Sequence, residues 1–230
     1  MDKHPSTNRG SASGGTEMNV KDNPKVKTVI IGYFDKWSPK QKYIFKRLGN
    51  KPSIEVRETM YNVDEEEGYK KIQPYIKQID AAYKKYIPAK YKAQRKKADE
   101  TEFKIDGTAF TTVTTNINFQ TTIHKDTGDD ENGYGNLTVI ENGSYEGGET
   151  CLPQYGIGVN VREGDILLMD VHEWHGNLPI RLKSPTAERM SVVCYLRNNV
   201  WKRTRKRTKA FRERHNKSLR GMRGKLASLR

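Results

Sequence analysis

The spacing of hydrophobic and polar positions changes along the 230-residue chain and divides it into two parts. A short β-branched run from Lys27 to Phe34 opens the first part and predicts a strand. Between residues 60 and 100, apolar positions recur every three or four residues, which predicts a helical support. From residue 103 to 198 the spacing falls to two, with Gly, Asn and Pro between the runs. The pattern therefore predicts a mainly β fold with flanking helices, of the α+β class.

The helical part carries one apolar stripe that is rich in tyrosine. Acidic residues at 64–67 are typical of a helix start, Pro74 is expected in the first turn, and Pro88 is expected to end the helix. Lysine and glutamine occupy the opposite side, so the stripe is predicted to pack against a sheet, with nucleobase stacking as the alternative role. The stripe comprises Ile72, Tyr75, Ile76, Ile79, Ala82, Tyr83 and Tyr86.

Alternate positions between Phe110 and Asp126 separate into an apolar face and a polar face. Exposure of the polar face to solvent is one interpretation of this segment. The polar face ends, however, in His124 and Asp126, whose side chains would project in the same direction from an extended backbone and could bind one metal ion. The apolar face comprises Val113, Ile117, Phe119 and Ile123, and the polar face comprises Asn116, Asn118, Gln120, Thr122, His124 and Asp126.

A distant histidine would complete a facial triad of two histidines and one carboxylate, a ligand set that suits ferrous iron. His172 and His175 both follow the predicted strand at residues 164–170, and their opposite parity would direct them to opposite faces of a continuous strand. His175 is the favoured ligand because Gly176 relieves crowding beside a metal. In that interpretation His172 is a neighbouring or surface residue.

Two arginines share one face of the segment from Arg189 to Arg197. A buried strand rarely carries two cations on one face, so this face is either exposed or lines a polar cavity. In a cavity, the guanidinium of Arg189 could hold a carboxylate by two parallel hydrogen bonds, and the hydroxyl of Ser191 could add a donor. The apolar face comprises Met190, Val192, Cys194 and Leu196, and the other face comprises Arg189, Ser191, Val193, Tyr195 and Arg197.

The formal net charge of +14 is concentrated near the C-terminus. Residues 201–230 hold 13 lysines and arginines against the single acid Glu213, and the remainder of the chain is almost neutral. Their weak apolar periodicity predicts a solvated, partly helical or disordered tail. The same cations could bind phosphates independently of base sequence, so DNA is the expected partner of this basic tail.

Composition limits the other properties of the chain. Residues 1–24 are rich in Ser, Gly, Thr and Lys and are expected to be disordered, so that residues 25–200 form the folded domain. Cys151 and Cys194 are the only cysteines, too few for a disulfide scaffold. Because no segment resembles a membrane span or a secretory signal, we expect an intracellular protein, nuclear in a eukaryote or in the host cytoplasm for a virus.

Short motifs follow one another in a specific order between Gly107 and Arg197. They are Phe110-Thr111-Thr112 with Thr115-Asn116-Ile117-Asn118, His124-Lys125-Asp126, Tyr145-Glu146-Gly147-Gly148-Glu149, Gly164-Asp165-Ile166-Leu167-Leu168-Met169-Asp170, His175-Gly176-Asn177, and Arg189-Met190-Ser191-Val192-Val193-Cys194-Tyr195. Each motif is modest alone, but in this order they resemble the TET/JBP family of nucleic-acid-modifying 2-oxoglutarate dioxygenases.

The resemblance implies a double-stranded β-helix, or jelly roll, that binds Fe(II) and 2-oxoglutarate. It further implies oxidation of the methyl group of 5-methylcytosine or thymine, flipped out of DNA. By position, His124, Asp126 and His175 match the family's metal ligands. Arg189 and Ser191 match the residues that bind 2-oxoglutarate.

The resemblance also suggests residues that contact the base. Tyr195 matches an aromatic residue that stacks on the flipped base in methylcytosine oxidases. Asp129 and Arg197 stand where those enzymes carry an asparagine and a histidine, which leaves the preferred base open. Asn116, on the polar face, is a further expected substrate contact.

Two other functions fit the same residues. A protein prolyl or lysyl hydroxylase of the same fold is one, because the triad and the arginine do not encode the substrate. A non-catalytic β-domain that only binds nucleic acid is the other, since the basic tail alone accounts for such binding.

Overall fold

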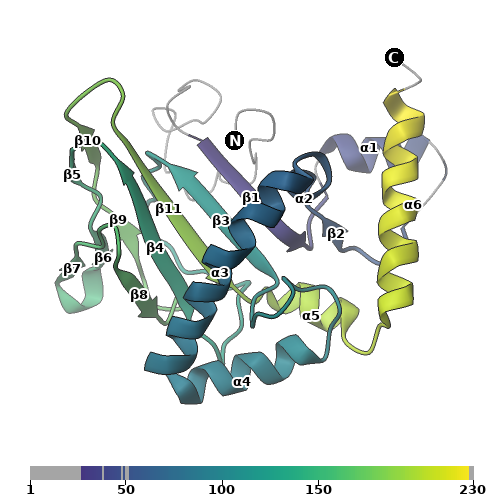
Figure 1. Ribbon diagram of the computed structural model, residues 1–230, viewed down its shortest axis with the longest axis horizontal. Helices are drawn as coiled ribbons and strands as arrows, with labels where there is room; N and C mark the ends of the chain where they lie inside the picture. Colours follow the sequence, from purple (N-terminus) through teal and green to yellow (C-terminus); the bar gives the residue numbers. More distant parts are fainter. Residues whose placement is uncertain (1–26, 38, 48, 50–51, 228–230) are drawn as a thin grey trace.

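The computed structural model describes residues 27–227 apart from 38, 48, 50 and 51, and its strands and helices form separate layers (Figure 1). One face of the main sheet is covered by helices, and the strands of this sheet are all antiparallel to their neighbours. Its six strands run in the order β2 (Arg57–Glu58), β1 (Lys27–Phe34), β3 (Thr112–Ile117), β11 (Glu188–Tyr195), β4 (Gly135–Asn142) and β8 (Ile166–Met169).

Two smaller sheets complete the β part of the molecule. Residues of the main sheet and of the smaller strands β6 and β9 line one pocket, so the layers enclose a cavity. This arrangement is the expected jelly roll with flanking helices. One small sheet pairs β10 (Ile180–Leu182) with β5 (Tyr145–Gly147), and the other has the order β7 (Ile157–Val159), β6 (Thr150–Leu152), β9 (Gly176–Asn177), with the 3-10 turn η2 (Pro153–Tyr155) between β6 and β7.

The helical layer consists of α2 (Met60–Asp64), α3 (Glu66–Tyr86) and α4 (Pro88–Asp99). The tyrosine-rich stripe lies on α3, where Ile76, Ile79 and Tyr83 are buried in the same hydrophobic cluster as strands β1, β3 and β11. Core packing is therefore its role, and burial of each large apolar side chain contributes about 1.5–3 kcal/mol. The expectation for Pro74 is wrong: α3 begins at Glu66, which places Pro74 in the helix interior.

Strand β11 has the two faces that its alternation predicts. Val192, Cys194 and Leu196 lie in the hydrophobic core with Met190 packed against it. The opposite face, from Arg189 to Arg197, lines the pocket.

The alternation predicted from Phe110 to Asp126 is wrong beyond Ile117. Strand β3 ends there, and Asn118 has a positive φ of 50°. A residue in this left-handed region turns the chain out of an extended path. As a result Phe119 lines the pocket, and Ile123 is 50% exposed.

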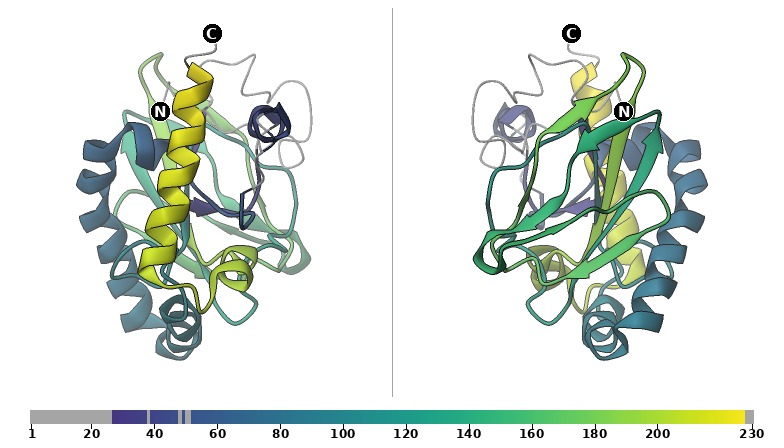
Figure 2. Two further views of the ribbon diagram at one scale, coloured as in Figure 1. Left: turned by 90° about the vertical axis from the view of Figure 1, so that its right-hand side faces the viewer. Right: turned by 90° about the vertical axis from the view of Figure 1, so that its left-hand side faces the viewer.

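The C-terminal segment is helical and largely exposed, as one of the expected alternatives has it, but it also packs on the domain and so extends the folded part past residue 200. Helix α5 (Asn198–Thr204) crosses that boundary, and α6 (Lys209–Ala227) runs along the side of the domain (Figure 2). His215 and Leu219 are buried, and Phe211 joins a second hydrophobic cluster. These three residues recur every four positions, a short stripe that the surrounding cations conceal in the sequence. The expected N-terminal tail lies outside the described residues.

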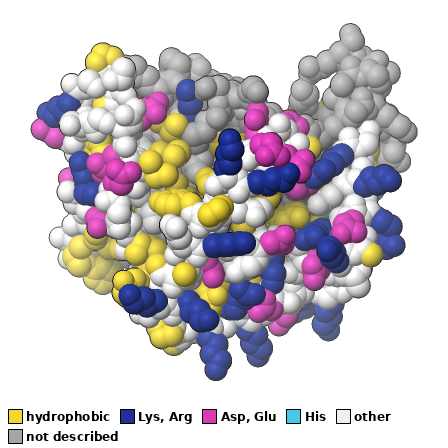
Figure 3. Space-filling view, in the orientation of Figure 1, with side chains coloured by type: hydrophobic (Ala, Val, Ile, Leu, Met, Phe, Trp, Pro, Cys, Tyr) yellow, Lys and Arg dark blue, Asp and Glu magenta, His cyan; other side chains and the backbone are white. Residues whose placement is uncertain are grey.

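Positive charge is not confined to the C-terminal helices. Figure 3 shows lysine and arginine side chains, interspersed with acidic ones, on the face that α3 and α4 cover. Helix α4 carries five lysines and arginines and one aspartate. Phe45 of α1 (Pro39–Arg47) and Leu219 of α6 line one small pocket. No helix in the described part of the chain is long and apolar enough to cross a membrane.

Candidate active site

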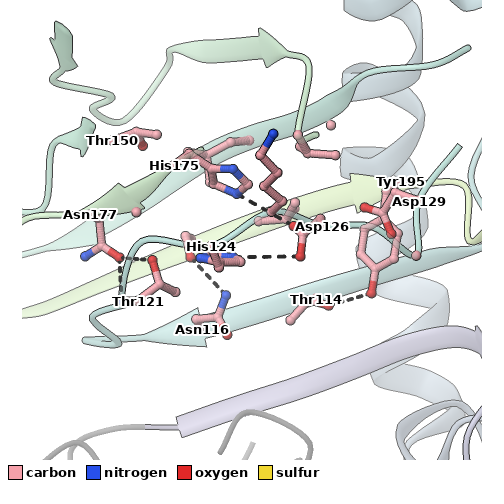
Figure 4. Close-up of a pocket in the computed structure, with 18 of the residues that line it drawn as sticks. Thr114, Asn116, Thr121, His124, Asp126, Asp129, Thr150, His175, Asn177 and Tyr195 are labelled. Carbon is pink, nitrogen blue, oxygen red and sulfur yellow. Dashed lines mark hydrogen bonds and ion pairs between the residues drawn. The ribbon is translucent and has the colours of Figure 1, made fainter. Parts of the chain in front are cut away.

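A pocket of about 450 Å³ lies between the main sheet and the smaller strands. In Figure 4, His124, Asp126 and His175 point toward one another, with Thr150 and Asn177 to one side of them and Asp129 and Tyr195 to the other. The pocket follows the polar face of β11, from Arg189 to Arg197. At about 3.3 Å per residue, Arg189 and Tyr195 are separated by roughly 20 Å along this strand.

Two backbone pairings bring the potential metal ligands together. The amide of His124 donates to the carbonyl of His175 at 2.8 Å, and the reverse bond is 3.0 Å. The amide of Asp126 donates to the carbonyl of Val171 at 2.9 Å. One ligand atom from each of His124, Asp126 and His175 lies within 4.8 Å of the others, close enough to share a metal ion.

Both histidines are oriented by the carbonyl two residues before them. Nδ1 of His124 lies 2.7 Å from the carbonyl oxygen of Thr122, and Nδ1 of His175 lies 2.8 Å from that of Glu173. Because a carbonyl only accepts hydrogen bonds, each Nδ1 carries a proton, and in the neutral ring Nε2 keeps the lone pair that a metal requires. Those Nε2 atoms are 3.7 Å and 3.8 Å from the carboxylate oxygens of Asp126.

His172 is held elsewhere. Its Nδ1 lies 3.0 Å from Oδ1 of Asp170, and it is not part of the three-residue group. Residues 170–173 form a turn, so the parity of a continuous strand does not apply to them. The structure therefore brings His175, and not His172, to His124 and Asp126.

Arg189 lies at one end of the pocket and is only 4% exposed. Its Nε has no hydrogen-bond partner among the described residues, and burial lowers the pKa of its guanidinium. The side chain lies against Gly148, where an added Cβ would be 2.9 Å from Nε, and beside the ring of Tyr145. Gly148 has a φ of +80°, so both conformation and space favour glycine at this position.

Ser191 and Asn116 line the middle of the pocket and are bonded to each other. The amide nitrogen of Asn116 donates to the hydroxyl of Ser191 at 3.3 Å, and its amide oxygen accepts from Thr28 at 2.8 Å. Asn116 thereby connects β1 to β11 across β3. This contact fixes the place of the Ser191 hydroxyl beside Arg189.

Tyr195, Arg197 and Asp129 lie together at the other end of the pocket. The hydroxyl of Tyr195 is 3.0 Å from that of Thr114, and Arg197 and Asp129 are paired through their backbones. Asp35, which the sequence interpretation missed, forms an ion pair with Arg197. The only signal for it was its place directly after the first predicted strand.

Comparison with known protein families gives this site a context. Residues 45–198 match the Tet_JBP model, described as the oxygenase domain of the 2OGFeDO superfamily. The chain belongs to this family. The expected TET/JBP resemblance is thus confirmed, and the match spans the site residues from Asn116 to Arg197.

Two relatives extend the comparison. The chain is 33% identical over 170 residues, 73% of its length, to "Thymine dioxygenase JBP1" of Trypanosoma brucei brucei. It is also 33% identical over 173 residues, 75% of its length, to "Bifunctional helicase and thymine dioxygenase JBP2" of Leishmania infantum. The matched regions cover only 19% and 15% of those proteins, which are far longer.

A solved structure supports the fold. The structure titled "NgTET1 in complex with 5mC DNA" matches 81% of this chain and 66% of its own chain. The TM-score is 0.57 at 14% sequence identity. The two proteins therefore share the arrangement of the jelly roll and its helices.

Proposed function

We propose that this chain is an Fe(II)- and 2-oxoglutarate-dependent dioxygenase that oxidises the 5-methyl group of a pyrimidine, 5-methylcytosine or thymine, in DNA. The observation that carries the proposal is the pairing, in one pocket, of a two-histidine, one-carboxylate group with a buried arginine that has an unpartnered Nε. Family membership and the relatives named as thymine dioxygenases support it. Those names favour thymine as the first base to test.

In this proposal His124, Asp126 and His175 hold the iron. Their donor set fits ferrous iron because both Nε2 lone pairs and the carboxylate converge, while the Nδ1 hydrogen bonds fix the tautomers. Bound iron supplies the oxidising chemistry, in which dioxygen and 2-oxoglutarate yield succinate and carbon dioxide as the methyl group becomes hydroxymethyl. The protein's part is to orient the ligands and the two substrates.

Arg189 and Ser191 bind the distal carboxylate of 2-oxoglutarate. The fit rests on the buried Nε of Arg189, which has no partner in the described residues, and on burial that lowers the pKa of this guanidinium. A carboxylate would satisfy the donor and offset the cost of burying the charge. The Ser191 hydroxyl, which accepts a hydrogen bond from Asn116, would add a further bond to this carboxylate.

Tyr195, Asp129 and Arg197 contact the flipped base at the opposite end of the pocket. Tyr195 offers an aromatic surface, and the other two offer an acceptor and a donor to a base edge. Asn116 lines the pocket between the two ends. Its amide groups are engaged by Thr28 and Ser191, so its part in the proposal is to keep Ser191 in place.

DNA is the proposed macromolecular partner, with the cations of residues 201–230 on its phosphates. Deleting this segment would not be a clean test, because His215 and Leu219 are buried in the domain. The contact is better tested by neutralising the exposed Lys209, Arg214 and Lys217. DNA binding should then weaken and depend less steeply on salt concentration.

The activity is tested with purified chain, Fe(II), 2-oxoglutarate and two DNA duplexes, one with thymine and one with 5-methylcytosine. Mass spectrometry of the digested DNA is expected to find hydroxymethylated base in at least one duplex. Asp126→Ala is expected to lose this product and stoichiometric iron binding, because a carboxylate ligand has been removed. Asp99→Ala, which removes an exposed carboxylate on α4, is the matched control.

Two outcomes would contradict the proposal. Unmodified DNA from an iron-loaded chain that still turns over 2-oxoglutarate would favour a protein hydroxylase of the same fold. If the wild-type chain yields no modified base and Asp126→Ala keeps normal iron and DNA binding, a non-catalytic DNA-binding domain would be favoured.

A further inference from the structure

Asp35 is a buried carboxylate beside the end of the pocket that contains Arg197, opposite Arg189. It directly follows β1 and is 4% exposed. One of its oxygens accepts a hydrogen bond from Nε of Arg197, and the other accepts from the side-chain amide of Asn199 at 2.9 Å. Although burial opposes its ionisation, the bond and charge of Arg197 hold the pKa of Asp35 below its usual range. Asp35 is thus a charged partner fixed beside the pocket.

The guanidinium of Arg197 has two close neighbours besides the carboxylates, Phe34 and Gly128. Its central carbon lies 4.6 Å from the ring centroid of Phe34. On Gly128, an added Cβ would stand 2.7 Å from one terminal nitrogen and 3.0 Å from the central carbon. Asp35 accepts a hydrogen bond from Nε, so these contacts together restrict the movement of the guanidinium.

The terminal nitrogens of Arg197 then remain next to Asp129. One of them is 3.7 Å from a carboxylate oxygen of Asp129, and both residues line the pocket. Arg197 presents only donors, whereas an ionised Asp129 presents only acceptors. Together with Asp35, the cluster holds two carboxylates and one guanidinium, so it has no excess positive charge to attract an anion.

We infer that Asp35 is a positioning residue for substrate recognition: by fixing Arg197 beside Asp129, it creates a rigid donor and acceptor pair for the uncharged edge of a pyrimidine. The inference rests on the proposed function. It assigns a role in substrate specificity to a residue that lies before the segment matched by the family model, residues 45–198. A pyrimidine edge carries an N–H donor beside carbonyl or ring-nitrogen acceptors, which complements this pair. The favoured ligand is therefore a neutral base, and not a phosphate or a second carboxylic acid.

The test compares Asp35→Ala, Asp35→Asn and the control Asp99→Asn with the wild-type chain. Asp99 also bonds an arginine, at 2.9 Å, but lies on α4 outside the pocket. Because a hydrogen bond to a charged group is lost, Asp35→Ala should lower kcat/KM for methylated DNA by about tenfold, mainly through KM. Asp35→Asn should have a smaller effect, because the amide oxygen still accepts from Arg197. The KM for 2-oxoglutarate should stay within about twofold of wild type in all variants.

A binding measurement supplies a readout that does not depend on turnover. Fluorescence anisotropy compares oligonucleotides with one 5-methylpyrimidine and with an abasic site at that position. Asp35→Ala should reduce the preference for the base-containing strand about tenfold, while binding to the abasic strand stays unchanged, because the phosphate contacts are intact.

Distinct results would overturn the inference. A folded Asp35→Ala variant with wild-type KM for DNA would refute it. Equal losses in the KM for DNA and for 2-oxoglutarate would show a merely structural role. If Asp35→Ala fails to fold, an Asp35→Asn variant with unchanged DNA recognition would also refute it. An inactive wild-type chain that also lacks preference for the base-containing strand would refute the proposed function itself.

Discussion

Arg189 and Arg197 occupy the same face of one polypeptide segment, yet among the described residues only Arg197 forms ion pairs with carboxylates. Arg189 has an unpartnered Nε within the described residues, and burial lowers its pKa although the neighbouring Tyr145 and Glu141 act in the opposite direction. Burial also acts against the charge of Arg197, but the neighbouring Tyr195, Asp35 and Asp129 raise its pKa. One cation is therefore left for an incoming ligand, whereas the other is already neutralised by the protein.

This difference separates two kinds of recognition in one pocket. A buried cation without a carboxylate partner gains most from an anionic ligand, which supplies the missing charge. A cation already paired with a carboxylate gains little from an anion, but its oriented N–H groups can still bond a neutral acceptor. The surroundings thus support the proposed binding of 2-oxoglutarate at the Arg189 end and of a base at the Arg197 end.

Exchanging each arginine for methionine should have the largest effect and tests whether the two ends of the pocket bind different ligands. Arg189→Met should lower kcat/KM for 2-oxoglutarate by about a hundredfold to a thousandfold, because truncating one partner of a buried charge pair costs about 2–5 kcal/mol. Arg197→Met should leave the KM for 2-oxoglutarate nearly unchanged and raise the KM for DNA. Steady-state kinetics with each substrate varied in turn measures both effects.

The control for the Arg189→Met and Arg197→Met variants is the turnover of 2-oxoglutarate to succinate in the absence of DNA. Succinate released slowly in the absence of DNA should disappear in Arg189→Met and persist in Arg197→Met. If both variants lose this succinate release equally, the two ends of the pocket do not bind different ligands, and the proposed difference between Arg189 and Arg197 is wrong.

Each arginine lies against a glycine, and these glycines offer a gentler test. Gly148→Ala places a Cβ 2.9 Å from Nε of Arg189 at a φ of +80°, so it should raise the KM for 2-oxoglutarate about tenfold. Gly128→Ala crowds the guanidinium of Arg197 and should raise the KM for DNA by several-fold at most, because Gly128 has no positive φ and the substitution adds no backbone strain. Initial-rate measurements distinguish the two; an increase in the same KM for both variants would contradict the expectation.

The sequence predicted those parts of the pocket that lie on a regular strand or helix, because there the periodicity of the sequence matches the folded structure. Strand β11 is buried on both faces, one by the helices and the other by the pocket, so its alternation identified Arg189, Ser191, Tyr195 and Arg197 as one group. The helical stripe of α3 was equally regular. A period of two or of 3.6 residues is visible in the sequence because side chains then face one environment over several turns or pleats.

The features that the sequence did not predict depend on contacts between segments that are far apart in the chain. The contact between Asp35 and Arg197 spans 162 positions, and no local pattern indicates it. The triad was grouped from a continuous strand, but Asn118 ends that alignment, and pairing with residues 171–175 assembles the site instead. The docking of α6 was concealed because cations surround its few buried residues.

Helix α6 supplies the smallest expected effect and lies outside the comparison of the two ends. His215 on α6 is buried, its Nε2 donates to the carbonyl of Val56 at 2.7 Å, and burial lowers its pKa. An unfolded histidine takes up a proton near pH 6.5, whereas the folded one resists it, so stability should fall as pH drops below about 6.5.

Thermal unfolding between pH 5 and 7 measures this effect. The wild-type Tm should decrease slightly at the acid end relative to His215→Gln, which keeps a donor for Val56 but does not titrate in this range. At pH 7 the substitution should leave both KM values unchanged, because His215 does not line the pocket. A change in either KM at pH 7 would mean that α6 influences the pocket. The different ligand preferences of Arg189 and Arg197 would then depend on more than the residues that contact them directly.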